Sequence, residues 1–432
     1  MKSIWENTVS LPKFPQVNKD LETDVLIIGG GICGILCAKK LHDNGVNYIL
    51  VEADEICKKT TANTTAKISS LHGILYSRLI KEVGEEKAKL YYKAHDEAIK
   101  EYEELCKNIE CDFEKTNAYV FTSDNKENIL KEYEAITKLG INAHFETNLD
   151  IPFKSLCGIK LENQAQFNPL KFIHGICKDL NIYENSKATG FIDDTPIVNG
   201  YKIHAKKIIV ATHFPFINKH GLYFLKMFQH RSYAIAIKTD KAIKGMYISD
   251  TEFGLSLREY KGMIILGGEG HRTGKSSNAW KGLENIADKY FPGNKIVNRW
   301  ATQDCITLDG MMYAGRYSPK TPNLYVATGF NKWGMTSSMV AANLLCNMIM
   351  GKGSVYEELY DPSRTILRKQ LLLNAFETLM GWLCFWNKRC PHLGCSLKWN
   401  KQERTWDCPC HGSRFDRNGH LLDGPSNHDV IK

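Results

Sequence analysis

The sequence predicts an α/β protein in which a parallel, nucleotide-binding sheet is joined to a mostly antiparallel second sheet and followed by a small all-β domain. Three observations predict this fold class. A glycine-rich turn joins an apolar strand to a helix at residues 24–41, strand-like segments follow one another at residues 233–266, and cysteines and histidines crowd together at residues 390–413. The first pattern is typical of parallel sheets, the second of antiparallel sheets, and the third of metal-binding loops.

The glycine-rich turn has the spacing of a dinucleotide-binding turn. Residues 25–28 are apolar β-formers, and Gly29, Gly31 and Gly34 follow them before a helical pattern. The first glycine permits the turn, the second lets the backbone approach a pyrophosphate, and the third lets helix and strand pack closely. A second strand ends in Glu52, eighteen residues beyond Gly34, where a carboxylate can accept hydrogen bonds from ribose hydroxyls. Because these pieces occur in order, they favour an adenine dinucleotide site over a glycine turn that binds nothing.

A threonine-rich stretch follows Glu52 and includes Thr65. Its hydroxyls and amides are placed to fold over the dinucleotide, and a solvated loop is an equally good interpretation. Apolar periodicity predicts the later elements. They are helices at 80–108, 126–139, 168–180 and 336–350, and strands at 118–122, 143–146, 207–212, 233–238, 246–248, 263–266 and 323–328.

The turn at residues 329–336 follows the last of these strands and opens the last helix. We expect it to point a second helix N-terminus at whatever the first glycine turn binds, since helix N-termini attract negative charge.

Composition excludes several classes of protein. The 432 residues are 43% hydrophobic and 24% charged, and the formal charge of +8 is spread along the chain. No clustered basic stripe indicates nucleic-acid binding, and residues 1–22 have no secretory signal pattern. The stretch at 371–386 is too short and too interrupted to span a membrane; a helix packed between domains is favoured over an interfacial membrane helix.

Most of the fourteen cysteines are scattered singly through apolar stretches. This distribution is typical of buried thiols in a reducing compartment, so we expect a cytoplasmic protein.

Residues 20–352 resemble the D-amino-acid oxidase/glycine oxidase superfamily of FAD-dependent enzymes. The resemblance depends on the glycine turn with Glu52, the strand end at 210–212, the stretch at 300–315 and the turn at 327–330. It implies that the first glycines hold the FAD pyrophosphate, that Glu52 holds the ribose, and that the second helix N-terminus faces the flavin. The FAD-binding residues implied are Gly29, Gly31, Gly34, Glu52, Thr65, Gly329, Asn331, Gly334, Met335 and Thr336.

The same resemblance implies removal of hydride from a carbon beside an amine nitrogen, which leaves an imine that hydrolyses. For a substrate with a carboxylate, an arginine is the expected clamp because its fork matches two oxygens. Arg231, Arg258 and Arg272 lie in the antiparallel region, and spacing does not choose among them. For each of them a surface charge is favoured over the clamp. His72 could reach the flavin, with a structural histidine slightly favoured.

The C-terminal cluster consists of the motifs Cys-Pro-His-Leu-Gly-Cys and Cys-Pro-Cys-His-Gly-Ser, which begin at Cys390 and Cys408. Two thiolates and two imidazoles on facing loops suit a [2Fe–2S] centre with mixed ligands or, less well, a zinc ion. The motifs resemble the Rieske motif, which assigns the iron ligands to Cys390, His392, Cys408 and His411. Cys395 and Cys410 are left over at matching places in the loops, and there we expect a disulfide. The strands before the first ligand loop of a full Rieske domain are missing, so the domain is expected to be truncated and to rest on the FAD domain or on a partner subunit.

The expected organisation is therefore a discontinuous FAD-binding domain, a substrate domain, a linker helix and a Rieske-type domain. The FAD-binding domain is expected at 20–80, 155–225 and 305–352, and the substrate domain at 81–154 and 226–304. The linker helix is expected at 353–386 and the Rieske-type domain at 387–432. The function predicted is oxidation of a small amine or amino acid, with electrons passing through the cluster to an acceptor protein or a quinone. Two alternatives stay open: a plain flavin oxidase with a non-functional C-terminal remnant, and a non-enzymatic electron-transfer or redox-sensing protein.

Overall fold

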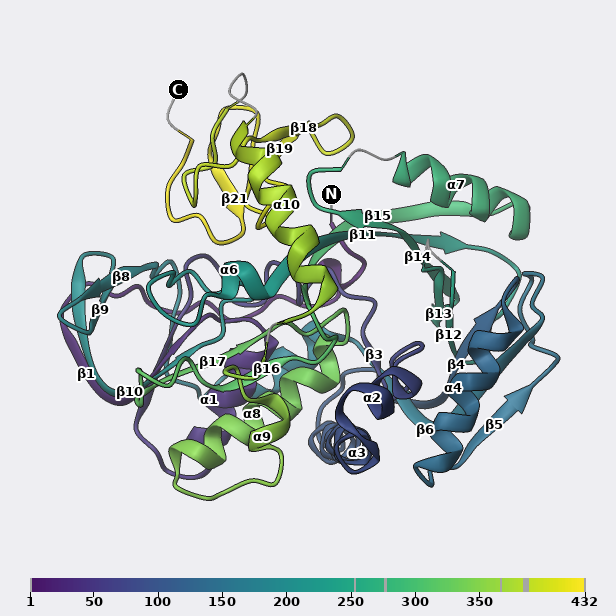
Figure 1. Ribbon diagram of the computed structural model, residues 1–432, viewed down its shortest axis with the longest axis horizontal. Helices are drawn as coiled ribbons and strands as arrows, with labels where there is room; N and C mark the ends of the chain where they lie inside the picture. The colour runs from purple at the N-terminus through teal and green to yellow at the C-terminus, as the bar shows by residue number, and fades with distance from the viewer. Residues whose placement is uncertain (1, 252–253, 276–277, 366, 384–387, 431–432) are drawn as a thin grey trace.

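The computed structural model describes residues 2–251, 254–275, 278–365, 367–383 and 388–430. Two large sheets stand side by side, and a small four-stranded sheet lies above them at the top of Figure 1. The mixed α/β architecture with a small all-β C-terminal domain confirms the predicted fold class.

The first sheet is mainly parallel and carries the glycine turn. Its main path runs in the order β16-β17-β10-β1-β2-β7, with the β8–β9 hairpin extending from β10. The strands are β1 (Leu21–Ile28), β2 (Tyr48–Val51), β7 (Ile182–Tyr183), β8 (Ala188–Ile192), β9 (Thr195–Val198), β10 (Tyr201–Val210), β16 (Tyr313–Arg316) and β17 (Leu324–Thr328). Along β1, Val25 and Ile27 belong to one hydrophobic core and Leu26 and Ile28 to another, because both faces of a parallel sheet are covered.

Helices cover one face of this sheet. They are α1 (Ile32–Asp43), α5 (Pro169–Ile176), α8 (Gly334–Ile349) and α9 (Glu357–Tyr360). Helices α1 and α8 pack against each other. They follow β1 and β17, which run parallel through β10, so their N-termini lie at the same edge of the sheet. Helix α5 ends at Ile176, earlier than expected from the sequence, because the chain turns there towards β7.

The second sheet has nine strands and is mostly antiparallel, with a parallel pairing between β12 and β4. Its strands are β3 (Lys67–Ile68), β4 (Glu114–Thr122), β5 (Ala143–Glu146), β6 (Cys157–Gln166), β11 (Met227–Lys238), β12 (Met246–Ser249), β13 (Ser256–Tyr260), β14 (Met263–Arg272) and β15 (Lys295–Thr307). The associated helices are α2 (Tyr76–Val83), α3 (Glu85–Cys106), α4 (Lys126–Lys138), α6 (Tyr223–Lys226) and α7 (Ala279–Tyr290), and a short 3₁₀ helix spans Trp5–Asn7. The single helix expected at 80–108 is two helices, because Gly84 between them has φ +86°.

The C-terminal region consists of α10 (Lys369–Leu383) and the strands β18 (Lys398–Asn400), β19 (Thr405–Asp407), β20 (Arg414–Phe415) and β21 (Leu421–Asp423). The strands pair in chain order and are antiparallel. No helix in the described ranges is long and apolar enough to cross a membrane.

Candidate functional site

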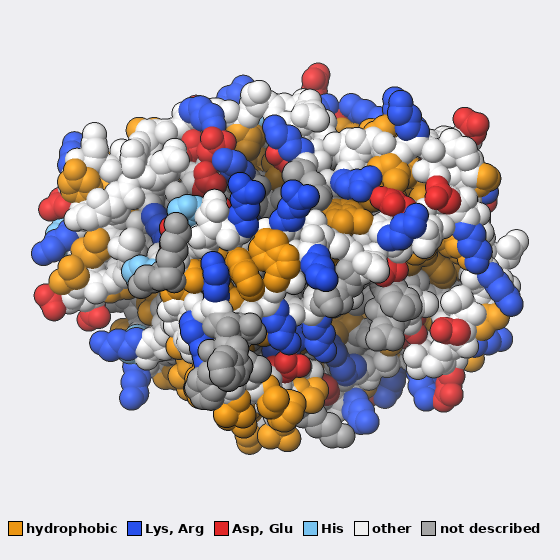
Figure 2. Space-filling view, turned by 90° about the horizontal axis from the view of Figure 1, so that it is seen from above, with side chains coloured by type: hydrophobic (Ala, Val, Ile, Leu, Met, Phe, Trp, Pro, Cys, Tyr) orange, Lys and Arg blue, Asp and Glu red, His pale blue; other side chains and the backbone are white. Residues whose placement is uncertain are grey.

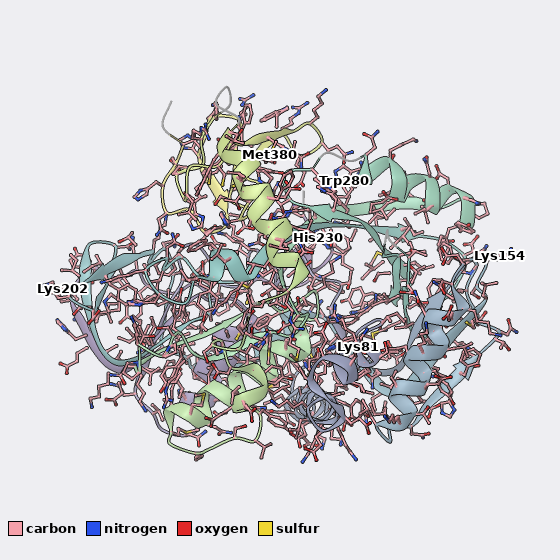
Figure 3. All side chains as sticks on the ribbon, in the orientation of Figure 1. Lys81, Lys154, Lys202, His230, Trp280 and Met380 are labelled. Atoms are coloured by element: carbon pink, nitrogen blue, oxygen red, sulfur yellow. The ribbon has the colours of Figure 1, made fainter. Side chains whose placement is uncertain are left out.

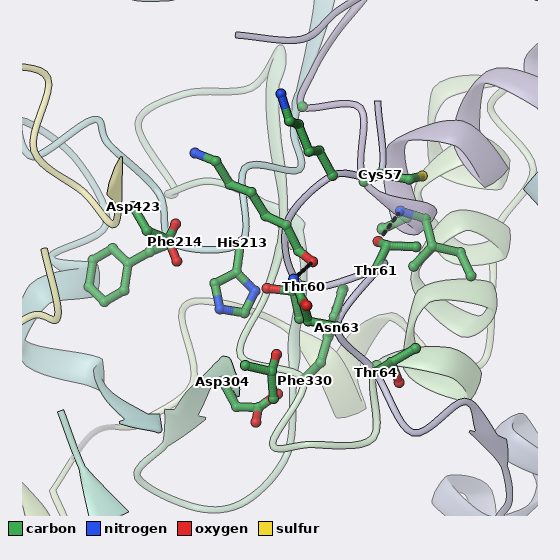
Figure 4. A pocket seen from close by; sticks show the side chains of 18 of the residues that line it. Cys57, Thr60, Thr61, Asn63, Thr64, His213, Phe214, Asp304, Phe330 and Asp423 are labelled. Atoms are coloured by element: carbon green, nitrogen blue, oxygen red, sulfur yellow. Dashed lines mark hydrogen bonds between the residues drawn. The ribbon is translucent and has the colours of Figure 1, made fainter. Parts of the chain in front are cut away.

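The glycine turn and the second helix N-terminus open into one cavity of about 510 Å³. Gly31, Ile32 and Cys33 at the start of α1 line it, together with Gly334 and Met335 at the start of α8. Figure 4 shows Thr61 and Thr64 on one side of the cavity and His213, Phe214 and Asp423 on the other. Both helix N-termini therefore face the same space, which suits a molecule with negative charge.

The three predicted glycines differ in what surrounds them. A Cβ on Gly29, which has φ +113°, would lie 2.5 Å from the carbonyl oxygen of Ala211, and a Cβ on Gly34 would lie 1.9 Å from the carbonyl oxygen of Gly29. A Cβ on Gly31 would meet only Thr61 Oγ1, at 3.7 Å. Gly29 and Gly34 thus permit close backbone packing, and Gly31 leaves open a space beside the helix N-terminus that a pyrophosphate can fill.

Glu52 and the threonine loop complete this end of the cavity. Glu52 Oε2 accepts a hydrogen bond from Gly30 N at 2.7 Å, and Thr61 Oγ1 accepts one from Ile32 N at 3.1 Å. Both residues, and Thr65, line the cavity. The loop is therefore part of the site and not simply solvated, and the residues present fit an adenine dinucleotide such as FAD.

Other residues predicted for the second turn lie behind the cavity wall. Asn331 Oδ1 accepts from Thr307 N at 2.9 Å, and Asn331 Nδ2 donates to the Gly329 carbonyl. Thr336 Oγ1 donates to the carbonyl of Ser69 at 3.1 Å. These contacts fix the shape of the turn from which Gly334 and Met335 reach the cavity.

The arginines predicted as carboxylate clamps have other partners. Arg258 is 1% exposed, and its Nη1 donates to the carbonyls of Thr65 and Ala66 at 3.0 and 2.8 Å. Arg272 donates to Pro409 O, and Arg231 pairs with Glu403. Among the described residues that line the cavity there is no arginine. The guanidinium groups of all three predicted arginines bond other parts of the protein instead.

His72 is buried behind the cavity wall, and both of its ring nitrogens have partners in the protein. Its ring nitrogens lie 2.6 Å from Tyr91 Oη and 2.6 Å from the Ser69 carbonyl, and its ring stacks on Trp333 at 4.4 Å. Burial lowers the pKa of His72 to about 3, so the ring is neutral at physiological pH. It supports the wall of the cavity through Trp333, which lines it.

Several titratable residues that line the cavity were not predicted from the sequence, among them Lys67, His213, Asp304 and Lys332. Burial, and secondarily the charge of Arg258, lowers the pKa of Lys67 to about 7. Burial raises the pKa of Asp304 and lowers that of Lys332. A signal was present in the sequence, since Lys67 ends the threonine loop and Lys332 lies in the second turn, but position along the chain does not tell which way a side chain points.

The predicted metal ligands gather at the contact between the C-terminal domain and the rest of the chain. Cys390, Cys408 and His411 are at most 2% exposed, and the ring centroids of His392 and His411 lie 5.0 Å apart. Nδ1 of each histidine is buried without a hydrogen-bond partner. Two unpartnered nitrogens beside buried thiols are what a mixed cysteine–histidine metal centre requires, so the residues fit the group.

The thiols around Cys408 lie close together. The sulfur atoms of Cys395, Cys408 and Cys410 lie within 4.8 Å of one another. Hydrogen bonds from Cys390, Cys395 and Cys410 lower the pKa of Cys408 well below its usual value, which favours the thiolate form that binds iron.

The predicted disulfide between Cys395 and Cys410 is not supported. Both are free thiols, and no cysteine pair among the described residues lies at bonding distance. Cys410 contacts Cys395 and Cys408 through hydrogen bonds, which raise its pKa. Backbone hydrogen bonds hold the shape of each loop. Both loops pack on α10, where a Cβ on Gly381 would lie 2.9 Å from Cys410 Sγ and 3.5 Å from Cys395 Cβ.

Residues outside the C-terminal domain hold both histidines. His392 Nε2 lies 3.0 Å from Asn218 Oδ1. The ring of Phe214 lies 6.4 Å from that of His392 and 6.5 Å from that of His411. The predicted truncated domain therefore rests on the rest of its own chain.

A buried ion-pair network fixes this docking. Glu403 bonds Arg231 and also Arg414, whose Nη2 lies 2.8 Å from Glu403 Oε2. Burial alone would raise the pKa of Glu403, but the charges of Arg231 and Arg414 outweigh burial and lower this pKa to about 2. Gln303 adds a hydrogen bond to the Gly412 carbonyl at 2.9 Å.

Comparisons with known proteins agree with these sites. Residues 24–348 match the family model of FAD-dependent oxidoreductases, and residues 359–432 match that of the Rieske [2Fe-2S] domain. The chain is 34% identical to the putative Rieske 2Fe-2S iron-sulfur protein YhfW of Bacillus subtilis, over 98% of this chain and 96% of that protein. A stretch covering 9% of the chain is 50% identical to a cytochrome b6-f complex iron-sulfur subunit of Cyanophora paradoxa, of which it covers 17%.

Solved structures share the fold of the larger part of the chain. Glycine oxidase from Geobacillus kaustophilus superposes with a TM-score of 0.68 at 13% identity and covers 80% of this chain and 100% of that one. L-proline dehydrogenase from P. horikoshii superposes with a TM-score of 0.67 at 16% identity, covering 80% and 98%.

Proposed function

The chain belongs to the FAD-dependent oxidoreductase family and carries a Rieske domain, and we propose that it oxidises a small amine or amino acid and passes the electrons through its iron–sulfur centre to an external acceptor. Its cofactors are FAD and a [2Fe–2S] cluster. When bound, FAD accepts a hydride and the cluster carries single electrons.

The observation that carries the proposal is the position of Phe214. Phe214 lines the FAD cavity, and its ring lies within 6.5 Å of both cluster histidine rings. Asp423 and Ser426 of the C-terminal domain also line the cavity. Only packed side chains such as Phe214 therefore lie between the two cofactor sites at this place. Such a short separation supports direct electron transfer between them.

Lys67 is proposed as the group that receives a proton from the substrate. An amine must be neutral before hydride can leave the adjacent carbon, and Lys67 has a pKa of about 7 on the cavity wall. In place of the arginine clamp, Lys332 on the cavity wall is proposed as the cation that pairs with a substrate carboxylate.

The proposal includes the cytoplasm as the compartment. In support, the thirteen cysteines among the described residues are all buried and free. The acceptor is proposed to be a protein or a quinone.

Anaerobic mixing of the holoprotein with small amines and amino acids tests the proposal. We expect the flavin absorbance to bleach and the electron paramagnetic resonance (EPR) signal of the reduced cluster to follow. In Cys408→Ser the flavin should still bleach without that signal, whereas Cys157→Ser, a buried cysteine far from the cluster motifs in sequence, should behave as the parent. Bleaching that never reaches an intact cluster would favour the plain oxidase. No bleaching by any small molecule would favour the electron-transfer protein.

A further inference from the structure

Helix α10 presents apolar side chains to the outside. Eight of the sixteen exposed large hydrophobic side chains in the described residues lie between residues 367 and 383. They are Leu367, Leu372, Leu373, Phe376, Leu379, Met380, Trp382 and Leu383, exposed by 43 to 82%. Met380 is labelled on α10 in Figure 3. The side of the molecule that faces the viewer in Figure 1 is the lower edge of Figure 2, and hydrophobic side chains gather there. A contiguous patch of this kind is unusual on a protein that works in isolation.

The inner face of the same helix is polar or small. Asn374 is 4% exposed and accepts a hydrogen bond from Arg272 Nη1 at 2.8 Å. Gly381, two turns further on, is buried against Cys410. A surface helix normally buries its apolar face and exposes its polar one, so α10 is reversed. The interpretation that α10 is simply packed between domains accounts for its polar face alone.

The charge around the helix favours a negatively charged cover. Between residues 364 and 389 the sequence has five cations and one acid, Glu377, although one of these cations, Arg364, is paired with Asp309. Lys388 is exposed, and Arg389 donates to the carbonyls of Trp382 and Gly394 at the helix C-terminus. Arg368, which pairs with Glu82 at 3.5 Å, lies at the other end. The cationic charge is therefore greatest at the C-terminal end of the helix. A second copy paired in parallel through α10 would bring two such ends together, whereas an anionic surface would attract that end.

We propose that the apolar face of α10 docks on an anionic lipid bilayer, with the helix lying in the plane of the interface. Leucine, phenylalanine and tryptophan side chains flanked by cations are the chemistry that such a surface binds. Because the inner face of α10 contacts Cys410, docking would hold the cluster loops beside the lipid. If the proposed function is correct, a lipid-soluble acceptor would meet the cluster there, but the docking itself does not depend on that function.

Flotation of the holoprotein with vesicles tests the proposal. We expect binding to vesicles of phosphatidylcholine with phosphatidylglycerol, weaker binding to phosphatidylcholine alone, and partial release by salt. The double variant Leu372→Ser/Phe376→Ser should bind about tenfold or more weakly, since each lost side chain removes buried apolar area. Ile192→Ser, which changes a side chain 53% exposed on β8, should bind as the parent.

Three results would overturn the proposal. The first is an absence of binding by a parent protein that shows its flavin and cluster spectra, and the second is equal binding by the double variant. The third is a lipid-free dimer that the double variant abolishes, which would make a second copy the cover. If the double variant loses its cluster signal, Phe376→Gln alone replaces it, and the same comparison with the parent decides.

Discussion

The two cofactor sites of this chain are assembled in opposite ways. The FAD cavity begins from contacts between near neighbours in sequence: Gly29, Gly34 and Glu52 lie on one strand–turn–helix–strand unit. The cluster site depends on residues far away along the chain, since His392 bonds Asn218 and the loop of Cys408 rests on Gln303 and Arg272. A local motif forms the starting point of the first site, whereas even the ligand loops of the second are held by residues of another part of the chain.

The C-terminal domain is therefore not independent of the rest of the chain, since each of the two parts contributes residues to the site of the other. It supplies Leu421, Asp423 and Ser426 to the wall of the FAD cavity, and it receives Asn218 and Phe214 at its histidines. A change in the docking contacts should therefore affect both sites, and a change within the glycine turn should affect only one. The following predictions use this asymmetry.

Gly34→Ala should have the largest effect, and only on the flavin. The added Cβ would lie 1.9 Å from the Gly29 carbonyl oxygen, so α1 must move away from the turn. We expect a cost of about 3 kcal/mol, or more than a hundredfold in FAD affinity. Flavin content and the cluster EPR signal are measured on one sample. Gly190→Ala is the control, because a Cβ there meets nothing within 4 Å; loss of the cluster in Gly34→Ala would show that the sites are not separable in this direction.

The sequence predicted the local site well and the shared site in part. The glycine turn, Glu52 and the four candidate ligands are all recognisable because each depends on residue types at fixed spacing. The arginine clamp was not recoverable, since whether Arg258 reaches the cavity or the backbone of residues 65–66 depends on how strands distant in sequence pair. For the same reason nothing in the sequence connects Asn218 with His392.

Lys67→Met should lower the rate of flavin bleaching by amines about a hundredfold, the usual contribution of a general base. Burial and Arg258 lower the pKa of Lys67 to about 7, so the neutral amine that accepts a proton forms as the pH rises through that value. The parent rate should therefore rise through about pH 7, and the variant should lose that rise. Lys58→Met, on the exposed edge of the same cavity, is the control; an unchanged pH profile in Lys67→Met would exclude Lys67 as the base.

Glu403→Gln should loosen the docking and affect both sites. The carboxylate bonds Arg231 and Arg414, and losing charge-assisted hydrogen bonds should lower the free energy of unfolding by about 2 kcal/mol. Because the pKa of Glu403 in the folded protein is about 2, below the ordinary glutamate value of 4.5, its contribution is complete above pH 4.5 and is lost as the pH falls towards 2. Denaturant unfolding between pH 7 and pH 3 measures this. Glu127→Gln, which breaks an exposed helix pair with Lys131, should leave the unfolding curve unchanged.

Asn218→Ala should have the smallest effect and is the most direct test of the shared site. Since Nδ1 of His392 has no protein partner and is the nitrogen available to iron, Nε2 carries the proton and donates it to Asn218 Oδ1 at 3.0 Å. That hydrogen bond makes the imidazole a stronger donor to the metal, which stabilises the oxidised cluster. Its loss should raise the reduction potential by about 30 mV. This is half of the 59 mV that corresponds to a tenfold change in the equilibrium constant of a one-electron reduction.

A potentiometric titration followed by EPR measures this shift, and Asn427→Ala separates it from a general loosening. Asn427 belongs to the same domain contact, but its side chain bonds the Thr189 carbonyl and not a cluster ligand. If both variants shift the potential equally, solvent entry at the contact is the cause. If neither variant shifts the potential, the rest of the chain holds the C-terminal domain in place without changing the reduction potential of its cluster. Distant residues then determine only the shape of the cluster site.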